Sequence, residues 1–175
     1  ARTVRCKQCR AEIPLLKTLW LAKKDSKRVL LRMQPRADGS GVDFAVESSV
    51  PSVGANHAAR REHDKRIGQG TMSRAGAWCP CCGKPGTVSM GTEDIRQEGL
   101  AGRLPACVTA VVVDGLGGKE YRSPLEEELQ AALVSRAELE AVFARVPFGI
   151  PSEAMPGKDA LGIRVPLYGF DRWDK

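Results

Sequence analysis

Two pairs of cysteines constrain this chain more than any other feature of its sequence. Cys6 and Cys9 enclose two residues, Cys79 and Cys82 do the same, and 69 residues lie between the pairs. A C-x-x-C turn, called a knuckle below, lets both of its sulfurs reach one metal ion. Two knuckles supply the four thiolates of a closed tetrahedral zinc site, which has no open position for water or substrate. The spacing therefore predicts one structural zinc ion held by Cys6, Cys9, Cys79 and Cys82.

Other uses of these cysteines are less well supported. A thioredoxin-like redox site has a single C-x-x-C that opens a helix, whereas here two pairs occur and Pro14 opposes a helix after the first. Disulfides need an oxidising compartment, and no signal-peptide pattern is visible. Cys81 lies between the two expected ligands of the second knuckle, so the register there stays open by one residue. Gly83 follows that knuckle, and we expect it to adopt the left-handed conformation that such turns favour.

Length and composition fit a small globular protein. The 175 residues suffice for one core, or for one core plus a metal-bound subdomain. Aromatic residues make up only 5% of the chain, so the core must be mainly aliphatic. No apolar run approaches the roughly 20 residues that cross a bilayer. We therefore expect a cytoplasmic protein without a membrane partner.

Positive charge is concentrated in the first part of the chain. Residues 1–75 hold 16 Lys and Arg against 7 Asp and Glu, whereas residues 76–175 hold 11 against 14. A basic surface beside a metal knuckle is typical of a protein that contacts nucleic-acid phosphates, although a solvated basic face without a partner has the same composition. The residues that we expect to contact DNA are Lys23, Lys24, Lys27, Arg28, Arg60, Arg61, Lys65 and Arg66.

The local patterns predict an α+β fold in two regions. In the first, residues 1–91, we expect a zinc ribbon with its two knuckles on β-hairpins, joined to a small antiparallel sheet. Strands are expected at 28–34 and 42–47, followed by a mobile basic segment at 48–70 in which 58–67 can be helical. The second region, residues 92–175, is expected to hold a short helix at 92–98 closed by Gly99, a buried strand at 106–113, a strand at 119–122, one long helix at 124–146 and an irregular tail.

Four stretches carry a family resemblance. CKQCRAEIPLLKTLWLAKK at 6–24, GTMSRAGAWCPCCG at 70–83, GKEYRSP at 118–124 and LYGFDRW at 167–173 resemble, in that order, the zinc-ribbon region of a family of large adenine-specific DNA methylases. The resemblance implies the ligand set Cys6, Cys9, Cys79 and Cys82. It also implies a parent enzyme that uses S-adenosylmethionine, with the ribbon lying inside that enzyme.

The chain departs from such an enzyme in its catalytic motifs. It has no glycine-rich loop between a strand and a helix for the cofactor, and no Asp-Pro dipeptide of the kind that holds a flipped adenine. We expect a piece without the catalytic core, which neither binds S-adenosylmethionine nor methylates DNA by itself. Two functions stay open for it, a DNA-contact segment of the methyltransferase or a structural or protein-interaction zinc module that braces the catalytic domain or a partner.

Overall fold

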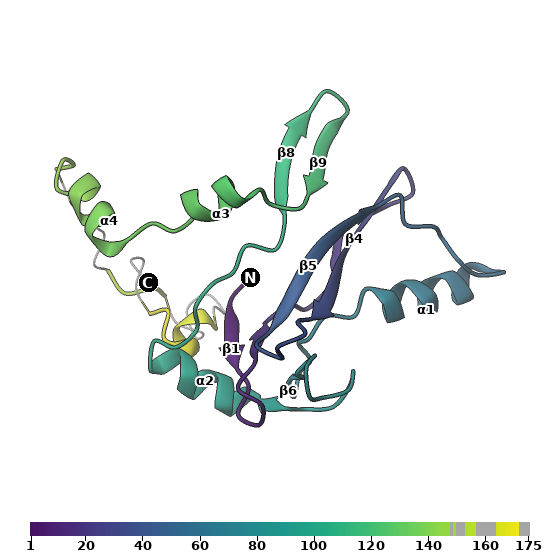
Figure 1. Cartoon of the computed structure of the whole chain (residues 1–175), viewed down its shortest axis with the longest axis horizontal. Helices are drawn as coiled ribbons and strands as arrows, with labels where there is room; N and C mark the ends of the chain where they lie inside the picture. The colour runs from purple at the N-terminus through teal and green to yellow at the C-terminus, as the bar shows by residue number, and fades with distance from the viewer. Residues whose placement is uncertain (148, 150–152, 157–163, 172–175) are drawn as a thin grey trace. The chain divides into compact units, whose positions relative to one another are not determined.

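A computed structural model describes residues 1–147, 149, 153–156 and 164–171. The chain divides into two compact units, one of Ala1–Thr92 with Pro105–Pro124 and one of Glu93–Leu104 with Leu125–Lys175. Within the described residues the fold is mixed α and β, with small antiparallel sheets and four α-helices (Figure 1). None of the helices in that part of the chain has the length and apolar character needed to cross a membrane.

Short antiparallel pairings build the first unit. Three of its sheets have two strands each, and the fourth has three in the order β3-β4-β5. The strands are β1 (Thr3–Arg5) with β2 (Glu12–Pro14), β3 (Trp20–Lys24) with β4 (Lys27–Pro35) and β5 (Val42–Ser48), β6 (Gly76–Ala77) with β7 (Met90–Gly91), and β8 (Val111–Gly115) with β9 (Gly118–Arg122).

The β4–β5 hairpin confirms the strands expected at 28–34 and 42–47. Its register pairs Leu31 with Val46, and the turn uses Gly39 at φ 68°, where a side chain would be strained. The Asp38 carboxylate accepts a hydrogen bond from the Ser40 N–H at 2.9 Å and so fixes the turn. The buried core of the first unit is mainly aliphatic, as the composition predicts, and its members include Val4, Ile13, Val29, Leu30, Leu31, Val42, Val50, Ala77 and Met90.

Helix α1 (His57–Ile67) forms in the basic segment and confirms that 58–67 is helical. Asn56 caps it, because the side-chain oxygen accepts the Ala59 N–H at 2.9 Å. The helix has no apolar stripe, and its one buried residue is Asp64. A polar helix of this kind needs a specific attachment to the sheet.

Asp64 supplies that attachment. Both of its carboxylate oxygens bind the guanidinium of Arg28 on β4, and Lys23 on β3 lies 3.2 Å from one of them. The indole N–H of Trp20 donates to the Asp64 carbonyl at 3.0 Å. The Arg28 guanidinium also lies 4.8 Å from the centre of the Trp20 ring. One buried residue thus joins α1 to two strands.

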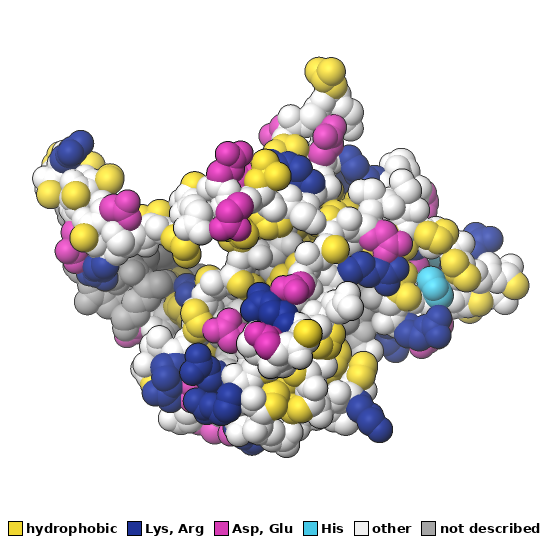
Figure 2. Space-filling view, in the orientation of Figure 1, with side chains coloured by type: hydrophobic (Ala, Val, Ile, Leu, Met, Phe, Trp, Pro, Cys, Tyr) yellow, Lys and Arg dark blue, Asp and Glu magenta, His cyan; other side chains and the backbone are white. Residues whose placement is uncertain are grey.

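The strand expected at 106–113 is wrong in extent and in burial. β8 begins at Val111, and Val112 is 50% exposed. The strand pairs with β9 in a sheet of two strands, so a face of the hairpin stays in solvent. Leu116 at the hairpin turn is fully exposed. Figure 2 shows a hydrophobic side chain at the tip of this hairpin. The strand expected at 119–122 is confirmed as β9.

The long helix expected at 124–146 is also wrong. The structure has two shorter helices, α3 (Glu126–Ala131) and α4 (Arg136–Phe143), and neither has a buried residue. The break has a local cause. The Ser135 hydroxyl accepts the Glu138 N–H at 3.2 Å while the Glu138 carboxylate accepts the Ser135 N–H at 2.8 Å. This capping box starts a new helix and competes with continuation of the first.

The second unit also contains α2 (Thr92–Leu100) and the 3-10 helix η1 (Val165–Tyr168). α2 confirms the helix expected at 92–98, but Gly99 lies inside it rather than closing it. A Cβ at Gly99 would clash with the backbone oxygen of Tyr168, so the glycine permits close approach of η1.

We predict that Asp64→Asn lowers the free energy of unfolding by about 3 kcal/mol at neutral pH, because the variant leaves Arg28 half-buried without its counter-ion. Arg28 and then Lys23 hold the pKa of Asp64 below its ordinary value. The stabilisation is therefore present above the unfolded pKa of about 3.9 and is lost as pH falls through the lower folded value. Urea unfolding of both proteins across pH 3 to 7 measures this difference.

Asp43→Asn is the matched control. Asp43 pairs with Arg36 at 2.7 Å, but its side chain is 71% exposed, so this substitution should cost less than about 1 kcal/mol. Equal losses in the two variants at neutral pH would contradict a special role for Asp64.

Candidate metal centre and basic surface

The four predicted ligands come together in one cluster. The sulfurs of Cys6, Cys9, Cys79 and Cys82 all lie within 4.8 Å of one another, with 3.8 Å between Cys6 and Cys82 and 3.5 Å between Cys9 and Cys79. Metal–sulfur bonds of about 2.3 Å in a tetrahedron place sulfurs roughly 3.8 Å apart. The cluster is therefore compatible with a metal ion, and all four cysteines are free thiols.

Each knuckle lies between the strands of a short antiparallel pair. β1 and β2 flank the first, and β6 and β7 flank the second. Both turns close in the same way, because the Arg10 N–H donates to the Cys6 carbonyl at 3.0 Å and the Gly83 N–H donates to the Cys79 carbonyl at 2.8 Å. Pairing of the flanking strands fixes the direction from which each pair of sulfurs approaches the cluster.

The glycine after the second knuckle has a different role from the one expected. Gly83 is not among the residues with positive φ, whereas Arg10, after the first knuckle, has φ 68°. A Cβ at position 83 would lie 2.9 Å from both the Cys79 carbonyl oxygen and the Ser89 hydroxyl. That hydroxyl accepts the Cys79 N–H at 3.0 Å. Gly83 is therefore needed for close packing against the buried ligand.

The thiols of the second knuckle are hard to ionise without a cation. Burial raises the pKa of Cys79 far above its ordinary value, and burial together with the neighbouring Cys9 thiol raises that of Cys82 to about 11. For Cys9, burial acts in the same direction, but hydrogen bonds from the Ala11 backbone and the nearby thiols lower the pKa overall. Crowded thiols of this kind ionise when a metal ion compensates their charge.

Cys81 lies outside the cluster. Its sulfur donates a hydrogen bond to the Gly41 carbonyl at 3.3 Å. The structure thus places Cys79 and Cys82, and not Cys81, with the first knuckle. Sequence reasoning missed two supporting groups, Ser89 and Met90, whose sulfur accepts the Lys7 N–H at 3.3 Å. Neither is marked by a motif, because each acts through backbone groups of the knuckles.

The eight predicted DNA-contact residues do not all share one environment. Six are exposed, namely Lys23 and Lys24 at the end of β3 and Arg60, Arg61, Lys65 and Arg66 on α1. Arg28 is instead occupied by Asp64 and by the Val50 carbonyl, which accepts its Nε–H at 2.9 Å.

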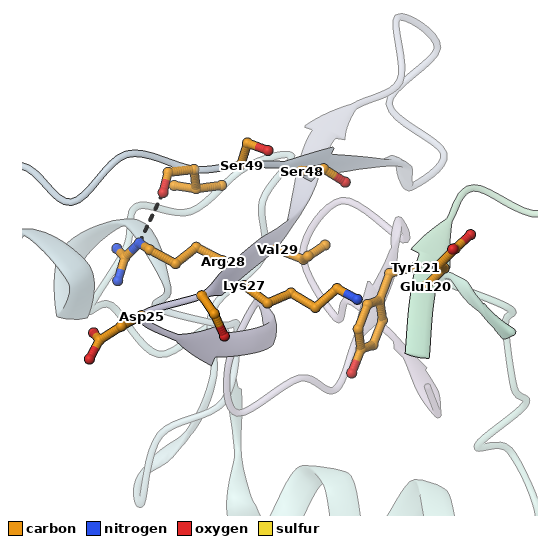
Figure 3. Close-up of a pocket in the computed structure, with 10 residues that line it drawn as sticks. Asp25, Lys27, Arg28, Val29, Ser48, Ser49, Glu120 and Tyr121 are labelled. Carbon is orange, nitrogen blue, oxygen red and sulfur yellow. Dashed lines mark hydrogen bonds between the residues drawn. The ribbon is translucent and has the colours of Figure 1, made fainter. Parts of the chain in front are cut away.

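Lys27 points away from α1. It lines a pocket of about 580 Å³ between the β3–β4 turn, the end of β5 and β9, and its side chain extends toward Tyr121 (Figure 3). Its ammonium donates to the Lys119 carbonyl. Asp25 and Glu120 line the same pocket, so charges of both signs meet there. The exposed basic surface is therefore formed by α1 and the end of β3, without Lys27 and Arg28.

Comparison with protein-family models, with curated proteins and with solved structures finds no match to this chain.

We predict that the purified chain binds about one metal ion and that Cys9→Ser reduces metal affinity by more than the roughly 10- to 100-fold typical of an outer-shell substitution. Cys9 is exposed, so the substitution removes a ligand without opening a cavity in the core. Cys81→Ser, in the other knuckle but outside the cluster, should retain the metal. Metal analysis and a competition titration measure both variants, and equal affinities would contradict the assignment.

A second substitution tests the packing of the knuckle. Gly83→Ala should destabilise the metal-bound protein by about 1 to 3 kcal/mol, because its methyl group would collide with backbone beside Cys79. Gly117→Ala is the control, since a Cβ there meets nothing within 4 Å. Thermal unfolding of both variants with metal bound should show the loss for position 83 alone; unchanged unfolding of Gly83→Ala would disprove the role of close packing.

Proposed function

We propose that this chain is a zinc-binding accessory segment that contacts duplex DNA. The observation that carries the proposal is the exposed basic surface of α1 and the end of β3, attached through Asp64 to a sheet whose unit also contains the cysteine cluster. Basic side chains on a fixed frame give affinity for phosphates with little base specificity.

The metal in this proposal is structural zinc. Four thiolates favour zinc among the common divalent ions of proteins, and they leave no coordination position for a substrate. Two knuckles on antiparallel strand pairs are typical of a zinc ribbon. The ion's task is to close a loop of 69 residues that includes α1 and the β3–β4–β5 sheet.

The sequence resemblance supplies the biological setting of the proposal. In a large adenine-specific methyltransferase, this segment would bind DNA beside a catalytic domain that carries S-adenosylmethionine and the base pocket. The catalytic domain, in the same chain or complex, is then its protein partner. The missing cofactor and base motifs explain why we assign no catalytic residue to this chain.

A second function is favoured by a different observation. Large apolar side chains are exposed on the β8–β9 hairpin and, separately, between α3 and α4 and on α4; examples are Leu116 in the first unit and Leu133, Val134 and Val142 in the second. Exposed apolar surface of this kind is typical of sites that contact another protein. A structural or interaction module would use these surfaces in place of α1.

DNA binding distinguishes the two functions. If about four phosphates are neutralised, the logarithm of affinity for a random duplex should fall with the logarithm of salt concentration with a slope near −3.6. Reversing the charge of Arg60 and Arg61 should weaken binding to all sequences alike and flatten the slope by roughly 2. Fluorescence anisotropy at several salt concentrations measures both; undetectable binding at low salt would favour the interaction module.

A further inference from the structure

A second pocket lies directly on the basic surface. It has a volume of about 490 Å³ and is lined by Lys23, Ala58, Arg61, Glu62 and Lys65. The four α1 residues are spaced by three, one and three positions, which places them on one face of the helix. Lys23 comes from the end of β3. Two elements distant in sequence thus form two walls of one basic pocket.

The attachment of α1 holds these walls in a defined arrangement. Asp64 precedes Lys65 and binds Arg28 and Lys23. Gly68 at the end of α1 has no side chain, and the Trp20 indole occupies the space that a Cβ would need. Because the strand and the helix are already fixed, an anion bound between them would not have to order them, and binding costs less conformational entropy.

The pocket has an excess of positive charge. Lys23 and Arg28 share the single carboxylate of Asp64, and Glu62 is the other acid near the pocket. Among the described residues, no hydrogen bond or ion pair engages the Arg61 or Lys65 side chain. Four cations against two carboxylates leave two uncompensated positive charges, which suits one phosphate group rather than a cluster of phosphates.

The side chains also suit phosphate in their geometry. A guanidinium presents a planar fork of N–H donors that binds two phosphate oxygens, while an ammonium acts as a compact point charge. The pocket offers one Arg and two Lys of this kind from two elements, β3 and α1. Figure 2 shows Lys and Arg side chains over α1, so a long polyanion can reach this surface.

We infer that the pocket between β3 and α1 binds a single backbone phosphate of duplex DNA, through Lys23, Arg61 and Lys65. This inference rests on the proposed function and adds a defined anchor to it. The other exposed basic residues, Lys24, Arg60 and Arg66, do not line the pocket, and they can contact further phosphates as solvated charges outside it.

A pair of neighbouring substitutions tests the anchor. Ala58→Glu places a carboxylate in the pocket, whereas Ala59→Glu adds the same charge at the next position of the same helical turn, outside the pocket lining. Both lie in the first turn of α1, where an acidic residue is favourable, so both variants should fold. With the full metal-bound chain and a random duplex at low salt, Ala58→Glu should weaken binding about 10-fold or more, and Ala59→Glu about 2-fold.

A second pair of substitutions removes a positive charge instead of adding a negative one. Lys65→Gln removes a pocket cation, and Lys24→Gln removes an exposed lysine outside the pocket. Because the pocket cations share one phosphate at short range, Lys65→Gln should weaken binding at low salt about 5-fold or more, and Lys24→Gln about 2-fold. If the unaltered chain binds DNA but the members of each pair weaken it equally, the anchor is wrong and the proposed function stands. If the unaltered chain does not bind DNA, both are wrong.

Discussion

The approach of four sulfurs from two distant knuckles is the contact on which the first unit depends. Its sheets have only two or three strands, and an isolated two-stranded pair is marginally stable in water. β1–β2 and β6–β7 each flank one knuckle, so a metal ion shared by both would add its binding free energy to the folding of both pairs. Hydrogen bonds of buried Thr71, whose hydroxyl donates to the Pro14 carbonyl, join the same two segments without a metal.

The residues between the knuckles form the surface of the proposed function. Closing so long a loop costs little more conformational entropy than closing a shorter one. Loop-closure entropy grows only with the logarithm of length, so 69 residues can be inserted once the ends are held together. Those residues form a sheet and a polar helix. The helix is attached to the sheet by charged side chains rather than by burial of apolar surface. Asp64 is the one buried residue of α1, and its partners come from β3 and β4.

The attachment of α1 through charged groups also explains which basic residues are available to a partner. The buried carboxylate of Asp64 needs a counter-ion, and Arg28 is that counter-ion. Lys27 turns to the β8–β9 hairpin. The other basic residues of α1 and the end of β3 are exposed. Some of them line a pocket with net positive charge. Affinity for a polyanion in this proposal is thus a by-product of how a polar helix is fixed to a sheet.

The sequence by itself determined the features that depend on residues close together in the chain. The C-x-x-C spacing identified the four sulfurs, alternation and turn glycines identified the β4–β5 hairpin, and the basic run identified α1. It also contained the Ser135–Glu138 capping box that divides the predicted long helix, a signal outweighed by the apolar spacing. The tertiary structure alone decided that Cys81 faces Gly41, that Gly83 is needed for space, and that Asp64 removes Arg28 from the surface. The reason is physical: these outcomes depend on contacts between residues far apart in the chain, and no local periodicity records them.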